Sequence, residues 1–190
     1  MHYRPATRFL AAVIAVAIVV PCFGVDGPTA TPSQVEAAYL LNFGKFFKPA
    51  VPQQPAGDFQ ICILGDDPTF ERVLSATVSG ETIEGRPVSS RHASNAADAL
   101  HCDLVFFGMS ERSKLGTDLA TLAAAPVLTV SDIPDFASHG GMIEFVPADN
   151  RIRFAVNLNA CRKSGLTPSS QLLKVAVKVI ATPSTGGGGL

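Results

Sequence analysis

Cysteine is scarce in this chain of 190 residues, and its spacing does not suit a metal site. The sequence has four cysteines, no C-x-x-C pair and no histidine at metal-ligand spacing from a cysteine. The chain also has no excess of positive charge, because it contains 15 Lys and Arg residues and 16 Asp and Glu residues. Nucleic-acid binders need a basic face, so this balance argues against nucleic acid as a partner.

Familiar enzyme motifs are missing as well. No serine lies in G-x-S-x-G, and no zinc-protease H-E-x-x-H occurs. The turn Gly65-Asp66-Asp67-Pro68 lacks the G-x-G-x-x-G spacing, and its two carboxylates would repel a pyrophosphate. Asp66 and Asp67 could hold a metal, but the sequence offers no clear third ligand. A helix cap at Asp67 is the simpler interpretation.

The histidines do not complete a catalytic group either. His92, His101 and His139 have no identifiable nucleophile or orienting partner, and surface or loop positions explain them more simply. An exported hydrolase therefore remains only a third hypothesis. We expect a non-enzymatic protein with no catalytic residue, no metal and no cofactor.

A long apolar run occurs only at the N-terminus. Residues 9–20 are apolar and follow Arg4 and Arg8, which is typical of a signal peptide; a membrane span needs about 18 or more residues. We expect removal of residues 1–24, which leaves 13 basic against 16 acidic residues in a soluble, exported protein. An uncleaved anchor and a lipoprotein acylated at Cys22 are the alternatives.

Cleavage would leave Cys62, Cys102 and Cys161. An oxidising compartment favours a disulfide, and three cysteines allow three pairings. Cys62 and Cys102 both fall in apolar segments typical of buried strands, and neighbouring strands lie close enough for a bridge. This placement favours Cys62–Cys102, and three buried thiols are the alternative.

Apolar periodicity and turn residues predict a single α/β domain over residues 33–181. It follows a flexible lead-in, residues 25–32, and precedes a flexible Gly-rich tail, residues 182–190. The predicted helices cover residues 33–47, 68–74, 94–100, 110–124 and 168–180. The predicted strands cover 59–65, 82–90, 102–107, 127–130, 142–146 and 152–158. Alternating strands and helices indicate a Rossmann-like, mainly parallel sheet flanked by helices. A C-terminal antiparallel hairpin, turning at Asp149-Asn150, and a final helix complete it.

Two groups of residues are candidates for binding a ligand or partner. Arg151 and Arg153 alternate on one strand face and could clamp an anion, or could form the solvated face of an edge hairpin opposite Glu144. Asn157 shares that face and could contact a ligand or satisfy backbone groups.

The second group ends the first predicted helix. Phe43, Phe46 and Phe47 cannot all point at one narrow core stripe. Phe47 is therefore either an exposed partner anchor or covered by the following loop. The last predicted helix is apolar over a broad arc, so one side could contact a second subunit or a target.

Several blocks of sequence, in this order and spacing, resemble the YfiR-like family from about Val35 to Val179. The blocks are Ala37-Ala38-Tyr39-Leu40-Leu41-Asn42-Phe43-Gly44-Lys45-Phe46, Ile61-Cys62-Ile63-Leu64-Gly65, Cys102-Asp103-Leu104-Val105-Phe106-Phe107, Val127-Leu128-Thr129-Val130-Ser131, Phe136 with Gly140-Gly141-Met142-Ile143, Arg151-Ile152-Arg153-Phe154 with Asn157-Leu158, and Ser170-Gln171-Leu172-Leu173.

The resemblance implies a periplasmic, non-enzymatic regulator with an α/β fold, often dimeric. Such proteins bind the periplasmic part of an inner-membrane diguanylate cyclase and keep it inactive, which lowers cyclic-di-GMP signalling and affects biofilm regulation. Redox state or a small ligand modulates the contact. Cys62 and Cys102 match the family's cysteine pair.

The chain also departs from the family pattern. Phe47-Lys48-Pro49 stands where members often carry Trp-Pro, and Cys161 alone cannot form a second internal bridge. The alternative function is a periplasmic small-molecule-binding module serving a sensor kinase or transporter. In that case Arg151, Arg153 and Asn157 would lie near the ligand.

Overall fold

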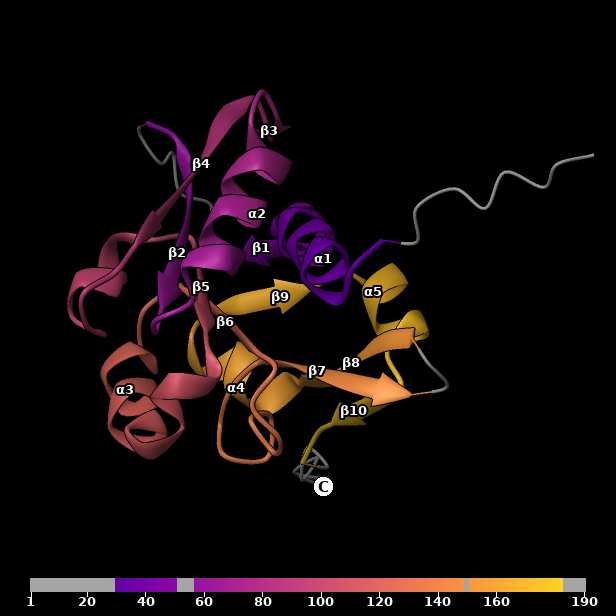
Figure 1. Ribbon diagram of the computed structural model, residues 1–190. Helices are drawn as coiled ribbons and strands as arrows, with labels where there is room; N and C mark the ends of the chain where they lie inside the picture. Colours follow the sequence, from indigo (N-terminus) through magenta and orange to yellow (C-terminus); the bar gives the residue numbers. More distant parts are fainter. Residues whose placement is uncertain (1–29, 51–56, 149–150, 183–190) are drawn as a thin grey trace, which may run out of the picture.

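A computed structural model describes residues 30–50, 57–148 and 151–182 (Figure 1). Its centre is an eight-stranded sheet in the order β10-β8-β7-β6-β5-β2-β4-β3. The strands are β2 (Phe59–Leu64), β3 (Thr82–Ile83), β4 (Arg86–His92), β5 (Leu104–Phe107), β6 (Leu128–Ser131), β7 (Ile143–Ala148), β8 (Arg151–Asn157) and β10 (Lys178–Ile180). The predicted leader, the Asp149-Asn150 turn and nearly all of the Gly-rich tail lie outside the described residues.

The sheet is mainly parallel, as predicted. Strands β4, β2, β5, β6 and β7 run parallel to one another, and β8 returns antiparallel to β7. The expected hairpin therefore extends the sheet. It does not end the sheet, because β10 pairs in parallel with β8 and takes the edge position.

Strand alternation supplies apolar side chains to both faces of the sheet. Ile61 and Ile63 of β2 belong to a core beneath α1 (Pro32–Phe46) and α2 (Pro68–Val78). Cys62 and Leu64 of the same strand belong to a second core beneath α3 (Leu115–Leu122). The result is a helix–sheet–helix arrangement of the expected α/β class. Among the described residues, no helix has the length and apolar character needed to cross a membrane.

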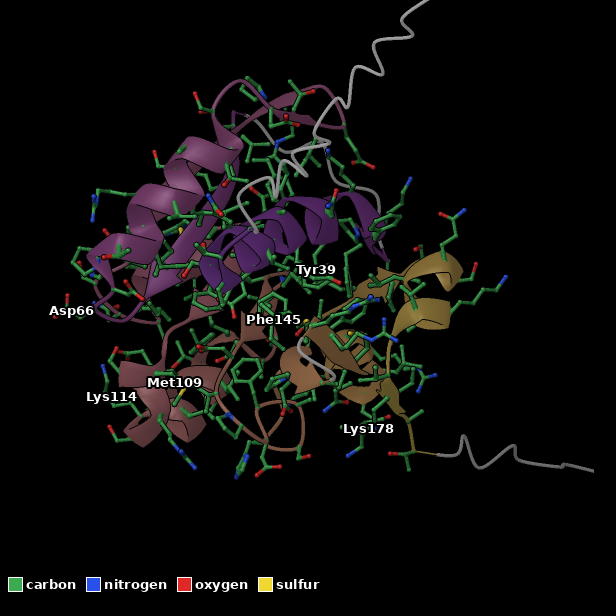
Figure 2. The ribbon with its side chains drawn as sticks, turned by 45° about the vertical axis from the view of Figure 1, so that its right-hand side comes forward. Tyr39, Asp66, Met109, Lys114, Phe145 and Lys178 are labelled. Carbon is green, nitrogen blue, oxygen red and sulfur yellow. A yellow bond between two sulfur atoms is a disulfide. The ribbon has the colours of Figure 1, made fainter. Side chains whose placement is uncertain are left out.

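The first helix begins where the sequence predicts. Thr31 and Gln34 form a reciprocal capping box, with Pro32 in the first turn. Tyr39 and Phe43 then lie against Phe145 and Phe154 of the C-terminal hairpin, with ring centroids 5.1 to 5.9 Å apart (Figure 2). The beginning and the end of the chain therefore share one core.

Three other helix predictions are right in part. The carboxylate of Asp67 accepts hydrogen bonds from the N–H groups of Thr69 and Phe70, so it caps α2 as expected. The predicted helix 94–100 is only a 3-10 turn, η1 (Asp98–His101). The predicted helix 110–124 divides into a 3-10 turn, η2 (Met109–Ser113), and α3. Ser110 lies inside η2, and its hydroxyl accepts a hydrogen bond from Asp66 N.

The prediction of one final helix over residues 168–180 is wrong. That region contains α5 (Ser170–Val175), which ends at the extended residue Ala176, and then β10. Valines at 175, 177 and 179 alternate with other residues, and β-branched side chains at this spacing favour a strand. The sequence analysis also missed α4 (Leu158–Lys163) and a two-stranded ribbon of β1 (Phe47–Pro49) and β9 (Leu166–Pro168).

Candidate functional site

Strand order changes direction beside β2. The chain passes from β2 to β4 on one side and then crosses to β5 on the other. In open α/β sheets, ligands bind outside the carboxyl ends of the strands at such a switch point. Here those ends are Leu64 of β2 and Phe107 of β5, with Ser131 of β6 next along the sheet.

A cleft of about 290 Å³ lies at this place, and we call it the switch-point cleft. Its walls are the first turns of α1, the turn after β2, the turn after β5 and the residue after β6. The polar lining residues are Ser33, Glu36, Asp66, Asp67, Ser110 and Asp132. Figure 2 shows Asp66 and Met109, which line opposite turns, on the same side of the molecule.

The two turns fit closely together. Gly65 has φ of +109°, and a Cβ there would lie 2.6 Å from Ser110 Oγ, so only glycine suits the position. The neighbouring Asp66 N donates to the same hydroxyl at 3.0 Å. This contact joins the carboxyl ends of β2 and β5 at the base of the cleft.

The cleft concentrates negative charge. Burial, and then the nearby carboxylates of Asp132 and Asp67, raise the pKa of Glu36 to about 7. Burial also raises the pKa of Asp132, and its Oδ1 is buried with no hydrogen-bond partner among the described protein atoms. Such a site favours a cation or a proton. Within the described ranges, no three potential metal ligands come together.

The three predicted hairpin residues do not form one site. Arg151 and Arg153 are exposed at the start of β8, whereas Asn157 is buried at its end, about 20 Å from Arg151 at the rise of an extended strand. The amide of Asn157 is already used: Nδ2 donates to Ala137 O, and Oδ1 accepts from the first turn of α4. Of its two predicted roles, Asn157 has the backbone-satisfying one.

The edge-hairpin interpretation of the arginines is right in part, because both side chains are exposed. Glu144 pairs in register with Ala155, and its carboxylate accepts from Asp135 N and Ala137 N. The carboxylate is therefore engaged by a loop and not by an arginine. β10 pairs in register only with Ala155 to Asn157, so Arg151 and Arg153 lie exposed on a part of β8 that has no described strand on that side.

The phenylalanines at the end of α1 lie mostly inside. Phe47 is buried in β1, where it pairs with Pro168 of β9. It is therefore covered by a strand distant in sequence, and the following loop of the second alternative lies mostly outside the described residues. Phe46 is half-buried and packs against the same core. Neither side chain is an exposed anchor.

Three exposed valines lie at the other end of the chain; the other exposed large apolar side chains among the described residues are Leu100 and Met109. Val175, Val177 and Val179 are 62%, 47% and 41% exposed around the edge strand β10. Arg153 and Lys178 are exposed beside them. We call this surface the β10 edge. Figure 2 shows Lys178 on the opposite side of the molecule from Asp66, so the β10 edge and the switch-point cleft are separate.

The Cys62–Cys102 disulfide is confirmed, with the two Cα atoms 6.0 Å apart. It joins β2 to the end of η1 inside the core below α3. Arg91 Nη2 donates to Cys102 Sγ at 3.5 Å, and Arg91 also pairs with Asp98 of η1. Cys161 is a buried free thiol, and burial raises its pKa to about 12.

The sequence analysis missed Glu36 and Asp132. Asp132 lies two residues after the predicted buried strand 127–130, and the carboxyl ends of parallel strands share one edge of a sheet. That signal could have placed it beside Asp66 and Asp67. Glu36 gave no such signal, because only the crossing of α1 over the sheet brings it there.

Two solved structures show the same fold at low identity. A structure described as the ABC domain in complex with L-Trp from Streptococcus pneumonia has a TM-score of 0.55 and 13% identity over 76% of this chain. A conserved domain protein from Vibrio cholerae has a TM-score of 0.53 and 11% identity over 78% of this chain. The matched part spans 60% of each of those two chains.

The family comparison covers almost all of the described chain. The family model described as YfiR/HmsC-like matches residues 33–177, from the first turn of α1 to the residue before β10. This range includes every strand of the sheet except β10, both cysteines of the disulfide and the acidic residues of the switch-point cleft. The chain therefore belongs to the YfiR/HmsC-like family.

Proposed function

We propose that this protein is a periplasmic regulator that binds the periplasmic part of an inner-membrane diguanylate cyclase and represses it. The observation that carries the proposal is the family match over residues 33–177, because YfiR-like proteins are regulators rather than enzymes. Repression would lower cyclic-di-GMP output inside the cell. Residues 1–24 would act as the export signal and be removed.

The β10 edge supports a function in protein contact. Exposed aliphatic side chains grouped at one place mark interaction surfaces more often than isolated ones do. Val175, Val177 and Val179 form such a group, with basic side chains at its border. A second copy of the chain could use the same surface.

Repression would work by population shift. A regulator that binds the inactive cyclase better than the active one moves the equilibrium by that difference in affinity. To change the ratio of inactive to active cyclase from 1:99 to 99:1, the regulator must bind the inactive state about 10⁴-fold more tightly. The Cys62–Cys102 bridge holds η1 against β2, so its redox state would modulate the contact if the partner touches that region.

The test is co-purification of residues 25–190 with the periplasmic domain of a co-encoded membrane cyclase, in oxidised and reduced buffer. We expect a stable complex in oxidised buffer. Loss of the complex on reduction would make the Cys62–Cys102 bridge part of the regulation. The absence of a complex in both buffers would contradict the proposal.

The switch-point cleft favours a second candidate, a small-molecule-binding module serving a sensor kinase or transporter. Its carboxylates suit a ligand with an amino group, and one fold neighbour is described in complex with L-Trp. Calorimetry with L-tryptophan would test this. Binding that is lost in Glu36→Gln and Asp132→Asn would support the candidate, and no heat of binding would count against this ligand.

A further inference from the structure

Charge is distributed very unevenly along this chain. All 16 acidic residues precede Arg151, and the segment from Arg151 to the C-terminus contains six basic residues and no acidic one. Five of the seven basic residues between positions 30 and 148 form an ion pair with a described carboxylate. Across the described ranges, none of the six later basic residues forms such a pair. The C-terminal segment therefore has unmatched positive charge.

Part of this charge lies beside an unpaired strand edge. In the described sheet, β10 pairs with β8 alone. Val177 N donates to Phe154 O at 2.9 Å, so the backbone groups of Val177 and Val179 face β8. Alternation along a strand then directs the N–H and C=O groups of Lys178 and Ile180 away from the sheet. No described residue is hydrogen-bonded to these outward groups, so an added strand could pair with them.

The side chains at this edge divide by face. Val179 lies beside Val156 and Lys178 beside Ala155, so valine and lysine point to opposite faces of the sheet. Arg151 and Arg153 share the face of Lys178, because each is an even number of residues from Ala155. One face of the edge therefore carries Val177 and Val179, and the other carries the basic side chains together with the half-buried Ile180.

We propose that the β10 edge binds an extended segment, in which acidic and aliphatic residues alternate, as an added β-strand. The acidic side chains would meet Lys178 and Arg153, and the aliphatic ones would meet Val177 and Val179. Main-chain hydrogen bonds give affinity in this mode of recognition, and alternate side chains give specificity. The inference rests on the proposed function, because the regulated membrane protein would carry the segment.

An anionic membrane is a poorer match for this surface. A bilayer accepts apolar side chains from one direction, whereas the valines and the basic residues here point to opposite faces. A lipid surface also provides no strand to bond the outward groups of Lys178 and Ile180. The backbone of an added peptide strand would supply hydrogen-bond partners for those groups.

The experiment measures fluorescence anisotropy of labelled eight-residue peptides with the full mature chain. One peptide alternates glutamate and valine, and its control alternates lysine and valine. We expect only the acidic peptide to bind, less tightly as salt rises. Arg153→Glu with Lys178→Glu should weaken binding about tenfold or more. The matched control, Arg162→Glu with Lys163→Glu on α4, makes the same charge change on exposed residues outside the sheet and should bind like the wild type.

Ile180→Pro tests the backbone part, because it removes an outward N–H without changing charge. It should also weaken binding, while thermal unfolding confirms that the variant is folded. Equal binding of both peptides, or wild-type binding by the charge variant or by Ile180→Pro, would overturn the proposal. So would binding to phosphatidylglycerol vesicles without binding to the peptide.

The same variants separate this inference from the proposed function. If the Arg153→Glu, Lys178→Glu variant captures the cyclase domain as well as the wild type does, the regulator function stands and this edge is not its interface. If the acidic peptide binds but the wild type captures no cyclase domain, the strand-binding edge stands and the cyclase assignment falls.

Discussion

Glu36 shows how a residue that is ordinary in the sequence acquires a special environment in the fold. It lies on the second turn of α1, where helix packing places it over the carboxyl ends of the strands. Burial and two neighbouring carboxylates raise its pKa to about 7. Near neutral pH, the folded protein therefore holds a proton that the unfolded chain releases.

This proton makes stability depend on pH. Between pH 4.5 and 7, the native state binds the proton and the unfolded state does not, so the free energy of unfolding falls as pH rises. The carboxyl is partly exposed, and solvent screening reduces the effect to about 1–2 kcal/mol. Glu36→Gln should therefore be more stable than the wild type at pH 8, with little difference at pH 4.5.

Urea unfolding of both proteins from pH 4.5 to 8 measures this difference. Glu84→Gln, at an exposed carboxylate outside the cleft, is the control and should keep the wild-type dependence on pH. A constant difference between Glu36→Gln and the wild type across this range would contradict the prediction.

At the scale of elements, close packing of α1 depends on one glycine. A Cβ on Gly44 would lie 2.6 Å from Ile83 Cδ1 and 2.8 Å from Phe59 Cζ, so the helix approaches the sheet closely at that point. We expect Gly44→Ala to lower the free energy of unfolding by about 1–2 kcal/mol, because overpacking exceeds the gain in helix propensity.

Gly116 of α3 provides the matched control. It is also helical, but nothing lies within 4 Å of the Cβ position, so Gly116→Ala should be neutral or stabilising by up to about 1 kcal/mol. Chemical denaturation of both variants measures the two values. Equal effects of the two substitutions would show that backbone propensity, and not packing, determines the result.

Elements with a strong local signal were predicted correctly from sequence. Thr31 and Asp67 mark the starts of α1 and α2 by side-chain caps that depend only on nearby residues. The segment from Val175 to Ile180 was ambiguous, since its apolar residues fit either a helix or a strand. Residues 178–180 form a strand because they pair with β8, which lies more than 20 residues earlier in the sequence.

At the scale of the whole molecule, the disulfide ties β2 to the end of η1, just before β5. Closing a loop with a sequence separation of 40 stabilises the fold by about 4 kcal/mol in the chain-entropy model. Cys62 and Cys102 are both buried, so we expect slow reduction of the native protein and a loss of about that much stability once reduced.

Urea unfolding of the oxidised protein and of the fully reduced protein checks this value. The control is Cys62→Ala with Cys102→Ala, which should not respond to reductant because Cys161 is a free thiol. Equal stability of oxidised and reduced wild type would show that the bridge constrains little in the unfolded chain.

The sheet and the disulfide could be predicted, but the geometry of both candidate surfaces could not. Cys62 and Cys102 lie in apolar runs that already indicate neighbouring strands. The switch-point cleft needs Glu36, Asp67 and Asp132 from three separate segments, and the β10 edge needs a strand order that no local pattern specifies. Sequence patterns report which face of an element is apolar, whereas these surfaces depend on which elements become neighbours.

The packing of α1 also has a consequence for synthesis of the chain. Tyr39 Oη donates to Ile152 O across 113 positions of sequence. At a translation rate of about 5–20 residues per second, that partner emerges about 6–23 s after the helix does. Throughout that interval Tyr39 and Phe43 of α1 lack their contacts with Phe145 and Phe154, so they would be open to chaperones or to aggregation. The first helix to be made is thus one of the last to be completed.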